Sequence, residues 1–318
     1  GLFYFGSVGM FKRESNNKMH GAVMSINTSG ELHSELNLGD AIPGEESSSE
    51  STHLFVSLSD LVSENIFYHP CYKNVESTLS DVELTSIDAI LGEVSMEEHF
   101  VATLTERIMQ SVKPNHQSVR VALGNADSYE LSSLLGGKAE AQEINPALGL
   151  RGVSRYAQTK FSSAFALECQ VIKALQEQGV HVEIVVPFVR ALSDAAKIID
   201  LLAEQGLPRG LNVLKVLYTV DVPSAALLSE RLLHYFDGLV INLENLTQFT
   251  LGVDRLSEEL EHLFDPQSEA VIDLIDMAVK AANHSNKPAL VVSSGLASYN
   301  KIQEYVLEHT YIQVVVTA

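Results

Sequence analysis

The sequence predicts an α/β fold, a (β/α)8 barrel of parallel strands. Short, continuous apolar stretches alternate with helical patterns along the chain, as in parallel strands that are covered on both faces. Counted from Ala22, these stretches number about eight, which is the number that closes such a barrel. The chain has 318 residues, 46% of them hydrophobic, so one barrel of roughly 250 residues with insertions accounts for nearly all of it.

The predicted strands are short and apolar, and turn residues bound them. The alternation becomes regular in the second half of the chain, where five of the strands lie. In order, the predicted strands are residues 22–26, 53–56, 118–123, 182–186, 213–220, 239–242, 289–292 and 312–316.

The predicted helices follow from apolar residues at helical spacing and from capping residues. Phe100, Leu104 and Ile108 show this spacing, and Ser59 is placed to cap a helix after the second strand. The main predicted helices are residues 96–112, about 159–178, 193–205, 223–235, 258–284 and 299–308.

One barrel over residues 22–318 is the expected domain organisation, preceded by an arm or tag remnant at 1–21. A polar insertion at about 28–52 is expected to be loop. A second long loop, at about 124–158, is expected to be functional, because loops of this length in compact domains usually are. The sequence stops at Ala318, directly after the last predicted strand, so the arm or a partner chain is expected to cover that strand.

Charge and cysteine content narrow the class of protein. The formal net charge of −20 disfavours nucleic acid and anionic membranes as partners, because the field repels phosphate. No apolar run approaches the roughly 20 residues that a membrane helix needs. Cys71 and Cys169 lie far apart without metal-ligand spacing, which indicates a reducing compartment and predicts a cytoplasmic protein.

Two acidic residues stand where predicted strands end. Asp221 follows the strand at 213–220, and Glu244 follows the strand at 239–242. Because the carboxyl ends of parallel strands meet at one edge of the sheet, both side chains are expected in one site, where they could hold a divalent cation. On spacing alone, the alternative that Asp221 caps the next helix and Glu244 is solvated is equally open.

Several stretches occur together in a fixed order. They are INPALGLRGVSRY, FALECQVIKAL, VVPFVRAL, VDVPSAALL, YFDGLVINLENLTQFTLGVDR and HLFD, between about Asn145 and Asp265. In order and spacing they resemble the carboxyl-terminal barrel of the phosphoenolpyruvate synthase (pyruvate, water dikinase) and pyruvate phosphate dikinase family, and a weaker match covers nearly the whole chain. The resemblance implies a barrel that binds phosphoenolpyruvate or pyruvate with Mg²⁺ and forms a homodimer.

The resemblance also implies which residues grip the substrate. Arg151 matches the loop arginine that holds phosphate, and Arg190 in PFVRAL is also family-like, as a ligand contact or as part of a structural ion pair. Two further arginines of the family are replaced here by Ser57 and Ala122. Arg120, two residues before Ala122, could substitute for one of them only with a shifted strand register.

The family's metal ligands and its catalytic cysteine are altered as well. Asp221 stands in place of a glutamate, Asn245 in place of an aspartate, and Glu244 in place of the asparagine before it. These changes leave a possible but weakened Mg²⁺ site. Ser294 replaces the cysteine that acts as acid toward the enolate carbon, and its hydroxyl is far less acidic than a thiol of pKa about 8.5.

Three functions from different classes remain open. A catalytically degenerate barrel would bind a small carboxylate or serve assembly or regulation. An active enzyme would hold Mg²⁺ on Asp221 and Glu244, its substrate on Arg151, and Ser294 at the reacting carbon. A structural domain would only dimerise. The family is one of phosphotransferases, but no nucleotide-binding loop or phosphohistidine segment is recognisable in this sequence.

Overall fold

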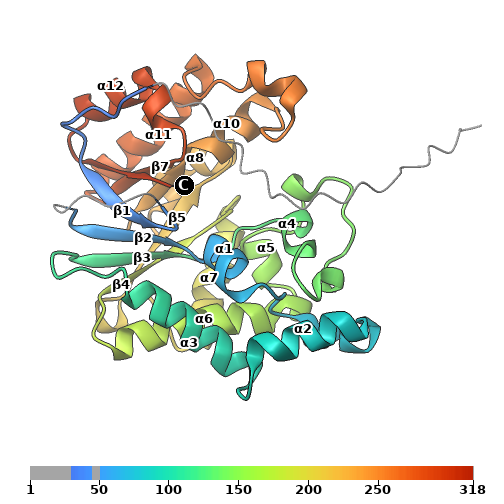
Figure 1. Ribbon diagram of the computed structural model, residues 1–318. Coiled ribbons are helices and arrows are strands. Elements are labelled where there is room, and N and C mark those ends of the chain that lie inside the picture. The colour runs from blue at the N-terminus through green and yellow to red at the C-terminus, as the bar shows by residue number, and fades with distance from the viewer. Residues whose placement is uncertain (1–29, 45–50, 318) are drawn as a thin grey trace, which may run out of the picture.

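The computed structural model describes residues 30–44 and 51–317, and it contains a closed barrel of eight parallel strands (Figure 1). Neighbouring strands pair in sequence order, and the eighth pairs with the first to close the barrel. The predicted fold class is therefore confirmed. The strands are β1 (Leu38–Ile42), β2 (His53–Ser57), β3 (Ser118–Ala122), β4 (Val182–Val186), β5 (Lys215–Val220), β6 (Leu239–Asn242), β7 (Ala289–Ser293) and β8 (Ile312–Val316).

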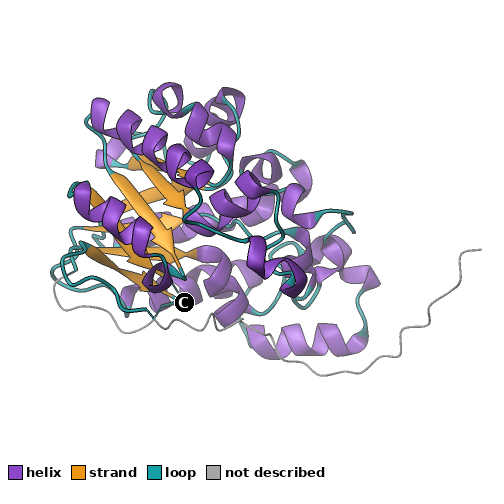
Figure 2. Ribbon diagram, turned by 90° about the horizontal axis from the view of Figure 1, so that it is seen from above, coloured by secondary structure: helices purple, strands orange, loops and turns teal. Residues whose placement is uncertain are grey.

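Helices lie around the strands, as Figure 2 shows. They are α1 (Leu58–Leu61), α2 (Asp81–Leu91), α3 (Met96–Met109), α4 (Ser128–Ser132), α5 (Val153–Tyr156), α6 (Ser162–Glu177), α7 (Leu192–Glu204), α8 (Pro223–Leu227), α9 (Ser229–Leu232), α10 (Leu243–Leu251), α11 (Glu269–His284) and α12 (Asn300–Glu308). Two predicted helices are each in two pieces: α8 and α9 replace 223–235, and the 3₁₀ helix Glu258–Leu263 precedes α11. No helix in the described ranges is both long and apolar enough to cross a membrane.

The position of the first strand differs from the prediction. Residues 22–26 lie outside the described part of the chain, and β1 lies within the insertion that was expected to be loop, so that expectation was wrong. Polar residues are tolerated in β1 because they have partners there: Asp40 accepts from Nε2 of His116 at 2.8 Å, and its backbone N–H donates to Oγ of Ser51 at 2.8 Å. Gly39 is also required, since a Cβ at this position would lie 2.9 Å from the His53 ring.

The segment before β1 lies against the last strand of the barrel. The backbone N–H of Val314 in β8 donates to the carbonyl of Asn37 at 3.0 Å, and Leu36 belongs to the same hydrophobic cluster as Val314. Gln303 of α12 accepts from the backbone N–H of His33 at 2.8 Å. These contacts help to cover β8, while the predicted arm at 1–21 lies outside the described residues.

The long loop at 124–158 lies on the side of the barrel where the strands end. It carries α4 and α5, which Figure 1 places near α1, the helix that directly follows β2. Ser57, rather than the predicted Ser59, caps α1 by accepting from the backbone N–H of Asp60. Ser59 instead accepts from the backbone N–H groups of Asn125 and Ala126, at 2.7 and 3.1 Å. The loop is thereby attached to the end of β2.

Candidate active site

Asp221 is fully buried at the end of β5 and accepts three hydrogen bonds. Its Oδ2 accepts from the backbone N–H of Phe188 at 2.8 Å and from the hydroxyl of Thr219, and its Oδ1 accepts from Nδ2 of Asn245 at 2.8 Å. It does not cap α8, because the N-cap position of this helix is Val222, which makes no side-chain hydrogen bond. Asp221 therefore joins the ends of β4, β5 and β6, and two of the three residues predicted as metal ligands, Asp221 and Asn245, bind each other.

Glu244 points to a different strand end. One of its oxygens, Oε1, accepts from the hydroxyl of Ser293 at 2.7 Å and from the backbone N–H of Ser294 at 2.9 Å, with a longer contact of 3.4 Å from the N–H of Gly295. The side chain is buried, with 7% of its surface exposed. Glu244 is thus neither solvated nor directed to Asp221 and Asn245, and it fastens the end of β7 to α10.

These residues do not fit a divalent cation as they are arranged. Hard cations such as Mg²⁺ need several free oxygen ligands with enough negative charge. Both oxygens of Asp221 already accept hydrogen bonds, Asn245 turns its amide N–H₂ toward Asp221, and Oε1 of Glu244 is engaged by the β7 end. Within 30–44 and 51–317, no three His, Cys, Asp or Glu side chains are grouped to hold a metal.

Arg151 and Arg190 lie on the same aromatic ring. The guanidinium carbon of Arg151 lies 4.2 Å from the centre of the Phe188 ring, and that of Arg190 lies 5.1 Å from it. Nε of Arg151 donates to the carbonyl of Asn125 at 2.9 Å, and Nη1 of Arg190 donates to the carbonyl of Arg151 at 3.2 Å. Stacking and the Nε bond fix the plane of Arg151, which is buried with 5% of its surface exposed, and neither contact uses its two Nη groups.

Phe188 connects these arginines to Asp221. Its backbone N–H donates to Asp221, while its φ of +52° places it in the left-handed region that bulky residues rarely adopt. Backbone strain of this kind costs on the order of 1–3 kcal/mol and persists only where surrounding contacts hold it. Here the hydrogen bond to Asp221 and the two stacked guanidinium groups supply such contacts.

Arg255 is a charged residue near Arg151 that the sequence did not single out. It follows α10, is exposed, and lies near enough to Arg151 that its charge helps to lower the pKa of Arg151, after the larger effect of burial. Glu130 of α4 lies near both arginines, and desolvation of its carboxyl group raises its pKa. Asp60 of α1 is solvent-accessible, and its pKa is raised in the same way, an effect that Arg255 opposes. The mouth of the barrel therefore carries acids beside its arginines.

The two positions expected to hold phosphate-binding arginines carry residues with structural roles instead. Ser57 caps α1, and Ala122 packs in the hydrophobic cluster inside the barrel. Arg120 does not replace them: it pairs with Glu183 of β4 in the strand register, Nε to Oε2 at 2.8 Å, and also donates to Gln313 of β8. Arg120 thus lies one inward-facing position below Ala122, in a polar layer of the barrel interior.

Ser294 lies at the end of β7, half-buried, with its hydroxyl 3.4 Å from Oε1 of Glu244. Its backbone N–H makes the shorter bond to the same oxygen, so the backbone is held more firmly than the hydroxyl. Ser294 therefore directly follows β7, with both its backbone N–H and its hydroxyl close to the Glu244 carboxylate.

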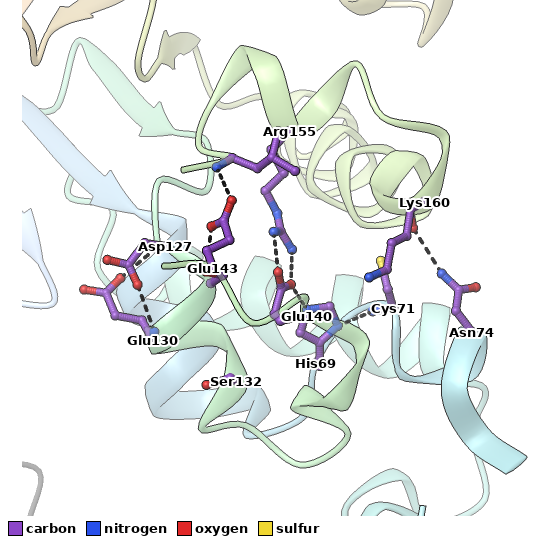
Figure 3. A network of polar contacts seen from close by, with 12 residues as sticks. His69, Cys71, Asn74, Asp127, Glu130, Ser132, Glu140, Glu143, Arg155 and Lys160 are labelled. Carbon is purple, nitrogen blue, oxygen red and sulfur yellow. Dashed lines mark hydrogen bonds and ion pairs between the residues drawn. The ribbon is translucent and has the colours of Figure 1, made fainter. Parts of the chain in front are cut away.

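A buried ion-pair network holds the long loop in place. Arg155 and Glu140 form two hydrogen bonds, of 2.9 and 2.5 Å, and Nε2 of His69 lies 2.6 Å from Oε1 of Glu140 (Figure 3). His69 Nδ1 accepts from the backbone N–H of Cys71, so Nε2 carries a proton and donates to Glu140. Burial raises the pKa of Glu140, but the hydrogen bonds from Arg155 and His69 outweigh this effect and lower the pKa to about 2.

A second acid fastens the same loop next to Arg151. Glu143 accepts from the hydroxyl of Ser128 at 2.7 Å and from the backbone N–H of Leu150 at 3.0 Å. Gly149 packs so closely on this carboxylate that a Cβ there would lie 2.1 Å from its Oε2. Contacts between the two halves of the loop therefore position Arg151.

Comparison with known proteins decides the family. The profile of the family described as "PEP-utilising enzyme, PEP-binding domain" matches residues 84–316. The chain belongs to this family. The match includes Arg151, Arg190, Asp221, Glu244, Arg255 and Ser294, and it excludes β1 and β2.

Relatives of this PEP-binding domain are phosphoenolpyruvate synthases. The chain is 42% identical to that of Pseudomonas aeruginosa over 195 residues and 38% identical to that of Escherichia coli over 218 residues. These matches cover 60% and 67% of this chain but 25% and 28% of the relatives. The matched region thus spans about a quarter of the relatives' length.

Two solved structures align with most of this chain at low sequence identity. A malate synthase from Haloferax volcanii is 10% identical, with a TM-score of 0.48, and covers 90% of this chain and 71% of its own. A citrate lyase beta subunit from M. tuberculosis is 11% identical, with a TM-score of 0.43, and covers 91% of this chain and 92% of its own.

Proposed function

We propose that this PEP-binding domain is a phosphoenolpyruvate synthase-like barrel that binds a small carboxylate at Arg151 and no longer catalyses phosphoryl transfer. The observation that carries the proposal is the use of the strand-end acids. Asp221 binds Asn245, and Glu244 binds the end of β7, so both carboxylates join strands together. A phosphoryl-transfer site needs such acids to hold a metal that offsets phosphate charge.

The charge at the mouth of the barrel supports the same proposal. Transfer of a phosphoryl group is catalysed mainly by positioned positive charge. Arg151 and Arg255 lie among the acids Asp60 and Glu130, while Ser57 and Ala122 stand where further arginines were expected. Such a site has too little net positive charge for a phosphate ester, but one or two guanidinium groups suffice for a carboxylate such as pyruvate or oxalate.

Restoring the aspartate expected at position 245 tests this proposal. In Asn245→Asp, two carboxylates face each other across the 2.8 Å contact that an amide and a carboxylate make now. Without metal, the repulsion is expected to destabilise the protein by about 1–3 kcal/mol. Millimolar Mg²⁺ should raise the melting temperature of this variant, because a bound ion stabilises the folded state, and leave the wild type unchanged.

Asn242→Asp is the matched control for this experiment. Asn242 caps α10 by accepting from the backbone N–H of Asn245, and an aspartate caps equally well. The control adds the same charge to the same turn without facing Asp221. A wild-type protein that Mg²⁺ stabilises as strongly as Asn245→Asp would overturn the proposal that the metal site is lost.

A homodimer and a cytoplasmic location stay predictions. The first rests on the family resemblance and the second on the cysteines, both of which are buried and free. Light scattering of the purified chain measures the oligomeric state directly, and a monomer would contradict the predicted dimer.

A further inference from the structure

Glu168, in the first half of α6, is a buried carboxyl group next to the long loop that carries Arg151. Its side chain retains 9% exposure, and its Oε2 accepts from the backbone N–H of Gly124 at 2.8 Å. Gly124 follows β3, and a Cβ on it would lie 2.7 Å from Oε1 of Glu168. The carboxyl group therefore lies directly against the backbone at the start of the long loop.

The segment at residues 124–126 links Glu168 to Arg151. The hydroxyl of Tyr156 donates to the carbonyl of Gly124 at 2.5 Å. One residue further on, the carbonyl of Asn125 accepts from Nε of Arg151 at 2.9 Å. A shift of this segment would therefore move the acceptor that fixes the guanidinium group in its plane.

The surroundings of Glu168 allow both of its protonation states near neutral pH. A cavity of about 40 Å³ borders its side chain, with Ser59, Tyr156, Phe161 and Phe165 among the lining residues. This volume is large enough for one or two waters, which would solvate either form. Burial raises the pKa of Glu168 to about 7, against the lowering effects of the Gly124 N–H and of Arg155.

Two titratable neighbours of Glu168, Tyr156 and Cys169, stay neutral in this range. Burial raises the pKa of Tyr156 on α5 well above 10, and burial likewise raises that of Cys169 on α6. The charged neighbours are Arg155 on α5, which is held in its ion pair with Glu140, and Lys173, which lies one turn along α6. Neither Tyr156 nor Cys169 therefore competes with Glu168 for a change of charge near neutral pH.

We infer that Glu168 is a positioning residue that couples carboxylate binding at Arg151 to the protonation of its own side chain. The inference rests on the proposed carboxylate site. Two hydrogen bonds and the backbone of residues 124 and 125 connect Glu168 to Arg151, so an ionised Glu168 lies close enough for its charge to oppose an anion bound at Arg151. Binding of a carboxylate should therefore be tightest when Glu168 is protonated, and should be accompanied by proton uptake near neutral pH.

Calorimetric titration of oxalate between pH 5.5 and 8.5 tests the inference, because both carboxylates of oxalate stay ionised over this range. The wild-type affinity is expected to fall about tenfold as the pH rises through 7. Glu168→Gln keeps an acceptor oxygen for Gly124 and removes the charge, so its affinity should not depend on pH. Glu177→Gln, at the exposed end of α6, is the control and should keep the wild-type profile.

The outcomes separate the inference from the proposed function. Wild-type binding that does not change with pH, or a Glu168→Gln variant that keeps the wild-type profile, would overturn the inference alone. The same holds if Glu130→Gln, rather than Glu168→Gln, removes the pH dependence. No wild-type binding at any pH would overturn the proposed carboxylate site, and the inference with it.

Thermal unfolding shows whether Glu168→Gln is folded and gives a second readout. A raised pKa means that the folded wild type binds more protons than the unfolded chain between about pH 4.5 and 7, so its stability is lost as the pH rises through this window. The variant should therefore melt at a higher temperature than the wild type at pH 8, with a smaller difference at pH 5. A variant that melts lower at both pH values would contradict the raised pKa of Glu168.

Discussion

Replacing Arg151 by alanine is expected to weaken oxalate binding by about 100-fold. Stacking on Phe188 and the bond from Nε to Asn125 hold the guanidinium group in one plane. Neither contact uses its two Nη groups. A paired, charge-assisted contact to a carboxylate contributes about 3 kcal/mol, which corresponds to this factor. Isothermal titration of oxalate into the two proteins measures the change directly.

Two further variants make the Arg151 result specific. Arg107→Ala removes a guanidinium group from α3, where it donates to Ser111 just after the end of the helix, and should bind oxalate as the wild type does. Arg255→Ala should weaken binding less than Arg151→Ala does, because Arg255 is exposed and its charge is partly balanced by Asp60 and Glu130. Wild-type affinity in Arg151→Ala would show that the ligand site lies elsewhere.

Replacing Glu140 by glutamine is expected to lower the free energy of unfolding by about 3–5 kcal/mol. The change leaves the Arg155 guanidinium group, which is 8% exposed, without its carboxylate. Breaking a buried ion pair from one side costs this much, because the remaining charge stays buried and unpaired. Urea denaturation at pH 7 measures the loss.

An exposed ion pair provides the control for Glu140. Glu97 pairs with Lys73, and both side chains are about half exposed, so Glu97→Gln should change stability by less than about 1 kcal/mol. The pH dependence gives a further check. Because the pKa of Glu140 is lowered to about 2, its contribution is present above about pH 4.5 and is lost as the pH falls toward 2. An equal loss in the two variants would contradict the account of the network.

The barrel could be predicted from the sequence because its strands are continuous and apolar, and seven of the eight lie close to their predicted positions. The first could not, because β1 contains Gly39 and Asp40, which favour loops. Their place in a strand depends on His53, Ser51 and His116, which approach only in the folded chain. The apolar residues 22–26 offered the stronger local pattern.

The strand ends were found from the sequence, but not the direction of their side chains. Glu244 and Asn245 are neighbours in the first turn of α10, where one position changes the direction of a side chain by about 100°. Asn245 therefore faces Asp221, while Glu244 faces the end of β7. Arg255 could not be found from the sequence because only the fold brings it near Arg151. It lies ten positions after Asn245, well beyond the strand end that the sequence indicated.

The titration of oxalate in millimolar Mg²⁺ and again in EDTA tests the central claim most directly. The account predicts the same affinity in both solutions, because Arg151 holds the carboxylate while Asp221 binds Phe188 and Asn245, and Glu244 binds the end of β7. Binding that requires the metal, and that is lost in Asp221→Ala, would contradict the account. It would mean that Asn245 and Glu244 turn toward a bound cation and that the barrel keeps a working enolate site.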